Sequence, residues 1–117
     1  MDIKRINPTQ RMSQAVIHAN VVYLAGQVAL DTPGAGVGTQ TSTILDQIDV
    51  LLEESGTNKS NLLSATIWLA SMDNFGEMNE VWDAWISEGS APARACVEAR
   101  LAAPQFTVEI AVVAAIN

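Results

Sequence analysis

Hydrophobic and polar residues follow two different periods along this chain. In QAVIHANVVYLAGQVA (14–29), two β-branched runs flank His18-Ala19-Asn20, which predicts two strands joined by a turn. Residues 39–56 instead carry apolar side chains at helical spacing, with Gly56 as a natural C-cap. These apolar positions are Ile44, Leu45, Ile48, Leu51 and Leu52. DTPGAGVG (31–38), rich in glycine and proline, is expected to be a loop.

The second half of the chain predicts another strand and another helix. NLLSATIWLASM (61–72) is rich in large apolar residues, which favours a strand buried on both faces. In the segment 74–89, Asn74 is followed three residues later by Glu77, the spacing of a capping box at the start of a helix. Apolar residues then repeat with helical spacing at Phe75, Met78, Val81, Trp82 and Trp85.

Two further strands are predicted at the C-terminal end. APARACVEARL (91–101) alternates small or apolar residues with Arg94, Cys96, Glu98 and Arg100, and after a turn at Pro104 comes the apolar segment FTVEIAVVAAI (106–116). The order β-β-α-β-α-β-β predicts an α+β fold, with two helices packed on one face of a mixed sheet. At 117 residues the chain is expected to form a single domain, residues 1–117.

The charge balance excludes two classes of partner. Acidic residues outnumber basic ones by 13 to 6, giving a net charge of −7, and the basic residues form no cluster of the kind that binds nucleic acid. Avid binding to an anionic membrane is excluded on the same ground. The longest apolar run, residues 110–116, is too short to cross a bilayer, and no export signal is expected in MDIKRINPTQ.

Two compositional features bear on assembly and location. The mean hydropathy of +0.19 is high for so small a domain, so part of the apolar surface is expected to lie in subunit contacts, including the sheet face without helices. Cys96 is the only cysteine, so no intrachain disulfide can form, and a cytoplasmic location is expected.

Arg94 and Glu109 are the strongest candidates for binding a substrate and transferring protons. A strand arginine offers a planar guanidinium fork to a substrate carboxylate. The alternative is an ion pair with Glu98 on the same face, or with Glu109 on a neighbouring strand. Glu109 is the only ionisable residue of its strand, and burial there would raise its pKa and let it exchange protons near neutrality. A plain ion pair with Arg94 or Arg100 is the alternative.

Other catalytic arrangements find less support. Cys96 lies far in sequence from the only histidine, His18, so a small buried thiol is favoured over a nucleophile. A lone histidine also excludes a two-histidine metal site, and no zinc spacing is present. The glycines of PGAGVG lack the lysine of a P-loop. Asn79, midway along the second helix, is by itself more typical of a solvated polar residue than of a ligand.

Four segments together resemble the RidA family of reactive-intermediate deaminases, also called the YjgF family. They are YLAGQVA (23–29), MNEVWDAW (78–85), APARACVEARL (91–101) and VEIAVVA (108–114), of which the third is the most specific. The resemblance runs from about residue 10 to the C-terminus. It implies a chorismate-mutase-like fold assembled as a homotrimer, with ligand clefts between neighbouring subunits.

The resemblance also implies an activity and a set of site residues. Family deaminases hydrolyse 2-imino acids and their enamine tautomers to 2-oxo acids and ammonia, without cofactor or metal. The carboxylate-binding arginine of the family falls on Arg94, its ligand-contacting cysteine on Cys96 and its water-positioning glutamate on Glu109. The helix asparagine falls on Asn79, and the Gly-Gln pair of the second strand on Gly26-Gln27.

This sequence departs from the family pattern at two positions. Met12 aligns with a tyrosine that lines the cleft, and Ala25 aligns with a serine before the Gly-Gln pair, so a hydroxyl is lost at each place. Three functions follow as hypotheses. The first is hydrolysis of small 2-imino or enamine acids in the cytoplasm. The second is non-catalytic binding of such metabolites or of 2-oxo acids in the same cleft. The third, ribonuclease activity, is attached by name to some family members and conflicts with the acidic charge.

Overall fold

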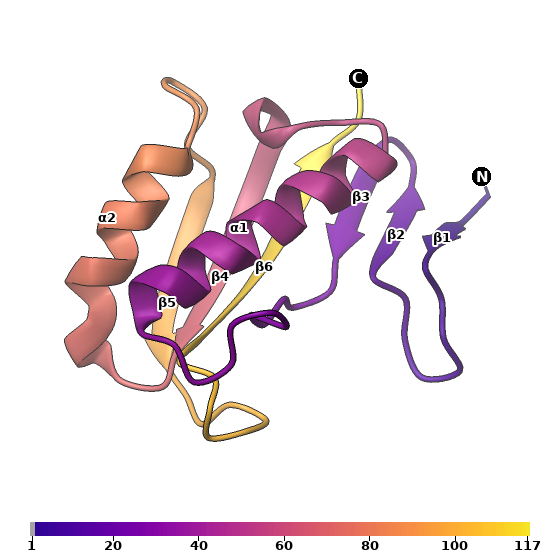
Figure 1. Cartoon of the computed structure of the whole chain (residues 1–117). Helices are drawn as coiled ribbons and strands as arrows, with labels where there is room; N and C mark the ends of the chain where they lie inside the picture. Colours follow the sequence, from indigo (N-terminus) through magenta and orange to yellow (C-terminus); the bar gives the residue numbers. More distant parts are fainter. Residues whose placement is uncertain (1) are drawn as a thin grey trace.

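Two helices pack against one side of a six-stranded sheet in the computed structural model, which describes residues 2–117 (Figure 1). The elements in chain order are β1 (Lys4–Ile6), β2 (Ala15–His18), β3 (Val21–Leu24), α1 (Val37–Glu54), the 3-10 helix η1 (Lys59–Asn61), β4 (Leu62–Leu69), the 3-10 helix η2 (Met72–Asn74), α2 (Phe75–Trp85), β5 (Ala93–Glu98) and β6 (Val108–Ala115).

The strand order in the sheet is β1-β2-β3-β6-β4-β5. β4 and β5 pair in parallel, whereas the other neighbours pair antiparallel, so the sheet is mixed and the predicted α+β fold is confirmed. The structure adds one strand to the predicted order, because β1 pairs with β2 at the edge of the sheet. The sequence pattern did not indicate β1 because it has only three residues, and two of them are exposed cations.

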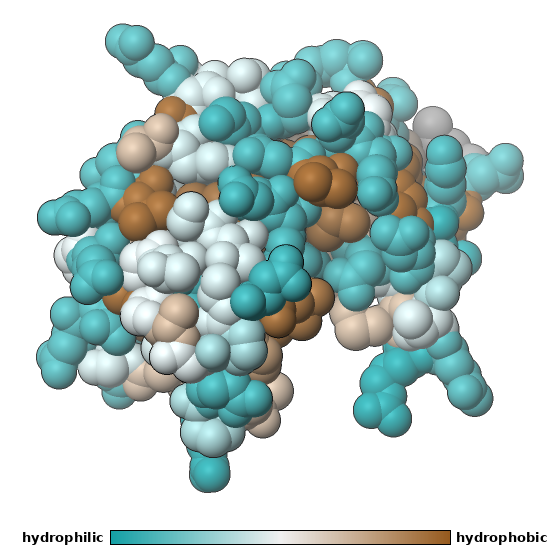
Figure 2. Space-filling model, in the orientation of Figure 1, coloured by the Kyte–Doolittle hydropathy of each residue, from teal (hydrophilic) through white to brown (hydrophobic). Residues whose placement is uncertain are grey.

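Only one face of the sheet is covered by helices (Figure 1). The molecule is 21 Å across its thinnest dimension, about the thickness of one helix layer on one sheet. All five apolar positions predicted for the first helix are buried in α1: Ile44, Leu45, Ile48, Leu51 and Leu52. Hydrophilic and neutral residues cover most of the outer side of this helix layer, with several hydrophobic residues between them (Figure 2). No helix among residues 2–117 is long and apolar enough to span a membrane.

β4 is buried on one face rather than on both, so that expectation was wrong for the single chain. Ala65, Ile67 and Leu69 point towards the helices and are buried, whereas Thr66 and Trp68 on the other face are only half-buried. The reason is that no second layer from residues 2–117 packs on that face. The large apolar content of this strand therefore belongs partly to a surface that the single chain leaves open.

The capping box predicted at Asn74 is not formed. A 3-10 turn, η2, precedes α2, so the backbone of Asn74 lies at φ −90° and ψ 4° instead of the extended conformation that a capping residue adopts, and its side chain caps nothing. Glu77 instead accepts a hydrogen bond from the backbone N–H of Gly38, at 3.1 Å. It thereby joins the first turns of the two helices. Gly56, at φ +85°, follows the C-cap Ser55 and ends α1 much as predicted.

Gln40, a fully buried side chain on α1, fixes the loop between β5 and β6. Its Nε2 donates to the carbonyl oxygens of Ala35 and Gln105, both at 2.9 Å, and its Oε1 accepts from the N–H of Thr107, at 2.9 Å. Buried backbone groups need such partners, because an unpaired one costs about 1–3 kcal/mol. One amide side chain therefore satisfies three backbone groups and ties α1 to the start of β6.

Replacing Gln40 with leucine tests this role. The Gln40→Leu change preserves size but removes three hydrogen bonds, and it leaves the carbonyl of Ala35 and the N–H of Thr107 without this partner, whereas the carbonyl of Gln105 keeps the N–H of Gly34. We therefore expect the free energy of unfolding to fall by about 2–4 kcal/mol. Urea denaturation at fixed protein concentration measures it. Gln105→Ala is the control, because the loop is held through the backbone carbonyl of Gln105 and its side chain is exposed. Equal stability of the leucine variant and the wild type would contradict this account.

Candidate functional site

Arg94 lies near the start of β5 and its side chain is exposed. The guanidinium lies against α2, with Cζ 5.4 Å from the ring centre of Trp82 and 5.9 Å from that of Phe75. Both rings offer the π-face that attracts a cation. The contacts hold the guanidinium in place without neutralising its charge.

The hydrogen-bond partner of Arg94 is a neutral amide. Nη1 of Arg94 donates to Oδ1 of Asn79 at 2.8 Å. The ion pairs considered as alternatives are not what the structure shows. Glu98 accepts the backbone N–H of Met72 at 3.0 Å, and Glu109 lies on β6, separated from β5 by β4. Glu109 is therefore not on a strand next to β5, and neither Glu98 nor Glu109 forms an ion pair with Arg94.

Asn79 has a specific role that its sequence context did not indicate. The interpretation as a solvated polar residue was wrong, because its side chain is half-buried and binds Arg94. Phe75, Asn79 and Trp82 are spaced four and three residues apart, so they share one face of α2. This spacing was visible in the sequence. What was missing was the knowledge that this helix face meets β5.

Cys96 lies two residues after Arg94 and points to the same side of the sheet. It is half-buried against the hydrophobic core. Burial raises the pKa of the Cys96 thiol above its ordinary value, an effect that the nearby charge of Arg94 partly offsets. A neutral thiol fits the prediction of a small packing residue. Among residues 2–117 no three histidine, cysteine or acidic side chains are grouped closely enough to hold a metal ion.

Glu109 near the start of β6 forms the second half of the candidate site. Its carboxylate lies over the backbone of Gly26, so close that a methyl group on Gly26 would collide with Oε2. Partial burial raises the pKa of the Glu109 carboxyl above its ordinary value. Gly26 thus leaves the space that the Glu109 carboxylate occupies, and the structure brings these two predicted residues together.

Arg94 and Glu109 lie on opposite faces of the sheet within one chain. Arg94 is paired with Ala65, which faces the helices and is buried. Glu109 is paired with Trp68, which faces the side without helices. Successive side chains of a strand alternate between faces, so this register separates the two groups. The single chain therefore contains two half-sites: Arg94 with Asn79 and Cys96, and Glu109 with Gly26.

Of the remaining predicted residues, Ala25 and Gln27 flank Gly26 in the second half-site, whereas Met12 lies in a loop. Ala25 lies between β3 and Gly26, and its N–H donates to the carbonyl of Gln14 at 2.9 Å. Gln27 is buried, and its Nε2 donates to Gln14 Oε1 at 3.0 Å and to the carbonyl of Ala25 at 3.1 Å. This network fixes the backbone on both sides of Gly26. Met12 is exposed in the loop between β1 and β2.

The comparisons with known proteins agree with this fold over nearly the whole chain. Residues 2–116 match the family model described as Endoribonuclease L-PSP. A RutC family protein of Haemophilus influenzae is 46% identical over 97% of this chain and 98% of that protein. The RutC family protein YoaB of Escherichia coli strain K12 is 45% identical over 99% of this chain and 100% of that protein.

A solved structure is equally similar. NMB1025 of Neisseria meningitidis, described as a member of the YjgF protein family, superposes with a TM-score of 0.93 at 44% identity, covering 100% of this chain and 97% of that chain. The family match, the identities and the shared fold lead to one conclusion: this chain belongs to the YjgF/RidA family.

Proposed function

We propose that this protein hydrolyses small 2-imino acids and their enamine tautomers to 2-oxo acids and ammonia. The observation that carries the proposal is Arg94, an exposed guanidinium held by Asn79 and two aromatic rings while no acid among residues 2–117 binds it. Such a group is suited to a substrate carboxylate, because it stays charged and offers two parallel donors. Family membership supports the same reaction.

The proposed site forms between two protomers. The sheet register keeps Arg94 and Glu109 on opposite faces of one chain, so a ligand that touches both requires a second copy. The uncovered sheet face carries half-exposed apolar residues such as Tyr23 and Val97, at 50% and 47% exposure. Apolar surface of this kind favours burial against another subunit. We propose a homotrimer, as the family resemblance implies, in a reducing cytoplasm that suits the lone Cys96.

The proposed chemistry needs one cation and one proton carrier. Arg94 anchors the carboxylate and so fixes the imine carbon in one place. Water adds to that carbon, which is electrophilic once the imine nitrogen is protonated. Glu109 accepts a proton from the water and returns one to the nitrogen, which leaves as ammonia while the carbonyl forms. Backbone near Gly26 and Cys96 contacts the ligand. The reaction needs no redox partner, because only water is consumed.

A binding protein without catalysis is the second candidate. The observation that favours it is the absence of a side-chain hydroxyl at Met12 and Ala25, where the family pattern has tyrosine and serine. A protein of this kind would bind 2-oxo acids in calorimetry and leave the rate of imine hydrolysis unchanged. Ribonuclease activity, named in the description of the family model, receives no support from a net charge of −7 or from the six scattered basic residues.

Substitution of Arg94 tests the carboxylate anchor. We expect Arg94→Ala to lower kcat/KM by about 10- to 100-fold, the loss of one charge-assisted interaction. Arg94→Lys keeps the charge but loses the fork, so an intermediate value is expected. The assay generates the imine in situ with an amino-acid oxidase and follows its loss. Lys59→Ala, which removes the same charge from η1, is the control. An alanine variant as active as the wild type would refute the anchor.

The pH dependence tests Glu109. Its pKa is raised above the ordinary value of 4.5, so the acid limb of the kcat/KM profile is expected above pH 4.5. Glu109→Gln is expected to remove this limb and lower the rate by about 10²- to 10⁴-fold. The raised pKa also means that the fold favours the neutral carboxyl. The contribution of Glu109 to the free energy of unfolding is therefore present below pH 4.5, and it is lost as the pH rises through the pKa of Glu109 in the folded protein. An acid limb that persists in the glutamine variant would contradict the assignment.

The Gly26→Ala variant tests whether activity depends on where the Glu109 carboxylate lies, because it moves the carboxylate without removing it. The added methyl group displaces the end of a flexible side chain, so we expect unfolding free energy to change little while activity falls. Gly76→Ala in α2 is the matched control, because no atom lies within 4 Å of its added methyl group. The control is expected to keep activity and gain about 0.5–1 kcal/mol of stability. Full activity in Gly26→Ala would show that the observed Glu109 position is unimportant.

A further inference from the structure

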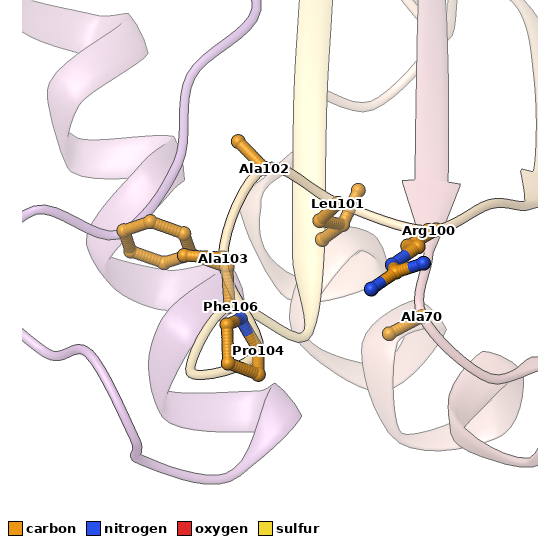
Figure 3. Close-up of a pocket in the computed structure, with 7 residues that line it drawn as sticks. All are labelled: Ala70, Arg100, Leu101, Ala102, Ala103, Pro104 and Phe106. Carbon is orange, nitrogen blue, oxygen red and sulfur yellow. The ribbon is translucent and has the colours of Figure 1, made fainter.

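A cavity of about 260 Å³ lies at the end of the sheet where β4 and β5 finish and β6 begins. Its walls are Ala70, which follows β4, and the loop that joins β5 to β6. Figure 3 shows Arg100 on one side of the cavity and Pro104 and Phe106 on the other. None of the residues proposed for imine hydrolysis lines it.

The lining combines one cation with apolar walls. Arg100 is the only charged residue among the lining residues, and no carboxylate accompanies it, although the chain as a whole carries a net charge of −7. Leu101, Pro104 and Phe106 supply apolar contact area, and small alanines leave the space open. A guanidinium fork in such surroundings is suited to a carboxylate, while the walls favour a short apolar tail on the same ligand.

The loop that forms the cavity is held in place before any ligand binds. Gln40, buried in α1, binds the carbonyl of Gln105 and the N–H of Thr107. The carbonyl of Gln105 also accepts the N–H of Gly34 at 2.9 Å, and the carbonyl of Thr107 accepts the N–H of Ala70 at 3.0 Å. A loop that is already fixed loses little conformational entropy when a ligand binds. The few contacts of a small ligand can therefore be enough for binding.

Arg94 cannot share one small ligand with Arg100 in the same chain. The two residues are six positions apart, and β5 extends from Ala93 to Glu98, so their Cα atoms are at most about 20 Å apart at the usual rise per residue. Arg94 is also held on α2 by Asn79. The cavity volume lies below that of typical drug-sized pockets, so its ligand has only a few carbon atoms.

We propose that this cavity is a second binding site, in which Arg100 holds a small organic monocarboxylate with a short apolar tail. The site is separate from the one proposed for imine hydrolysis and does not depend on it. Inorganic phosphate also binds arginine, but it would make no use of the walls formed by Leu101, Pro104 and Phe106. The geometry therefore favours a carboxylate over a bare phosphate.

Titration of the full-length protein with isobutyrate, followed by ¹⁵N NMR, tests the proposal. We expect saturable shifts at the backbone N–H of Ala70, at those of loop residues 100–106 other than Pro104, and at the side-chain N–H of Arg100. Arg100→Ala is expected to weaken binding at these signals at least tenfold, and Arg100→Lys to weaken it less. Arg94→Ala is expected to leave this binding unchanged. Shifts confined to the surroundings of Arg94 would overturn the proposal.

Two further ligands test which features of isobutyrate the cavity recognises. Isobutyramide has the same shape without the charge, so it is expected to bind at least tenfold more weakly than isobutyrate. Equal affinity would refute the role of the Arg100 charge. Inorganic phosphate is expected to bind more weakly than isobutyrate, and equal affinity would refute the role of the apolar walls. Circular dichroism checks the fold of the variants, and because Arg100 is exposed we expect no change in melting temperature.

Discussion

The pairing of β4 with β5 on one side and β6 on the other sets the sheet face that each side chain of the candidate site occupies. The register places Ala65 beside Arg94 and Trp68 beside Glu109, and these two β4 residues point to opposite faces. A shift of one residue in either pairing would reverse the face of a whole strand, with a large loss of buried apolar area. Burial of the hydrophobic core therefore fixes the strand register that keeps the two half-sites on opposite faces of the sheet.

That separation gives the uncovered sheet face its significance. One layer of helices leaves β-strand residues such as Trp68 and Val97 partly exposed, and Glu109 lies among them. An acid placed on a surface suited to a subunit contact becomes more desolvated when the contact forms. The rise already present in its pKa points in the direction that proton transfer near neutrality requires. Assembly and catalysis would then draw on the same face of the protein.

Arg94 is positioned differently, by groups that leave its charge available. An ion pair with an acid would hold the guanidinium equally well, but the acid would compete with any anionic ligand. Asn79 contributes one acceptor, and Trp82 contributes a π-face. Neither carries a formal charge. An arginine anchored in this way is ordered before it meets a carboxylate, so less entropy is lost on binding.

The sequence alone determined most of the element types and the order of most elements, because apolar periodicity records which face of each helix or strand is buried. It also singled out Arg94 and Glu109, since charged residues are conspicuous in short apolar strands. It did not indicate β1, whose three residues are too few to show a period, and it wrongly predicted a capping box at Asn74. Only the tertiary structure decided which strand lies between β5 and β6, which residue Asn79 contacts, and how Gln40 fixes the loop that follows Arg100. These relations depend on pairing between residues distant in sequence, and local patterns of polarity do not encode that pairing.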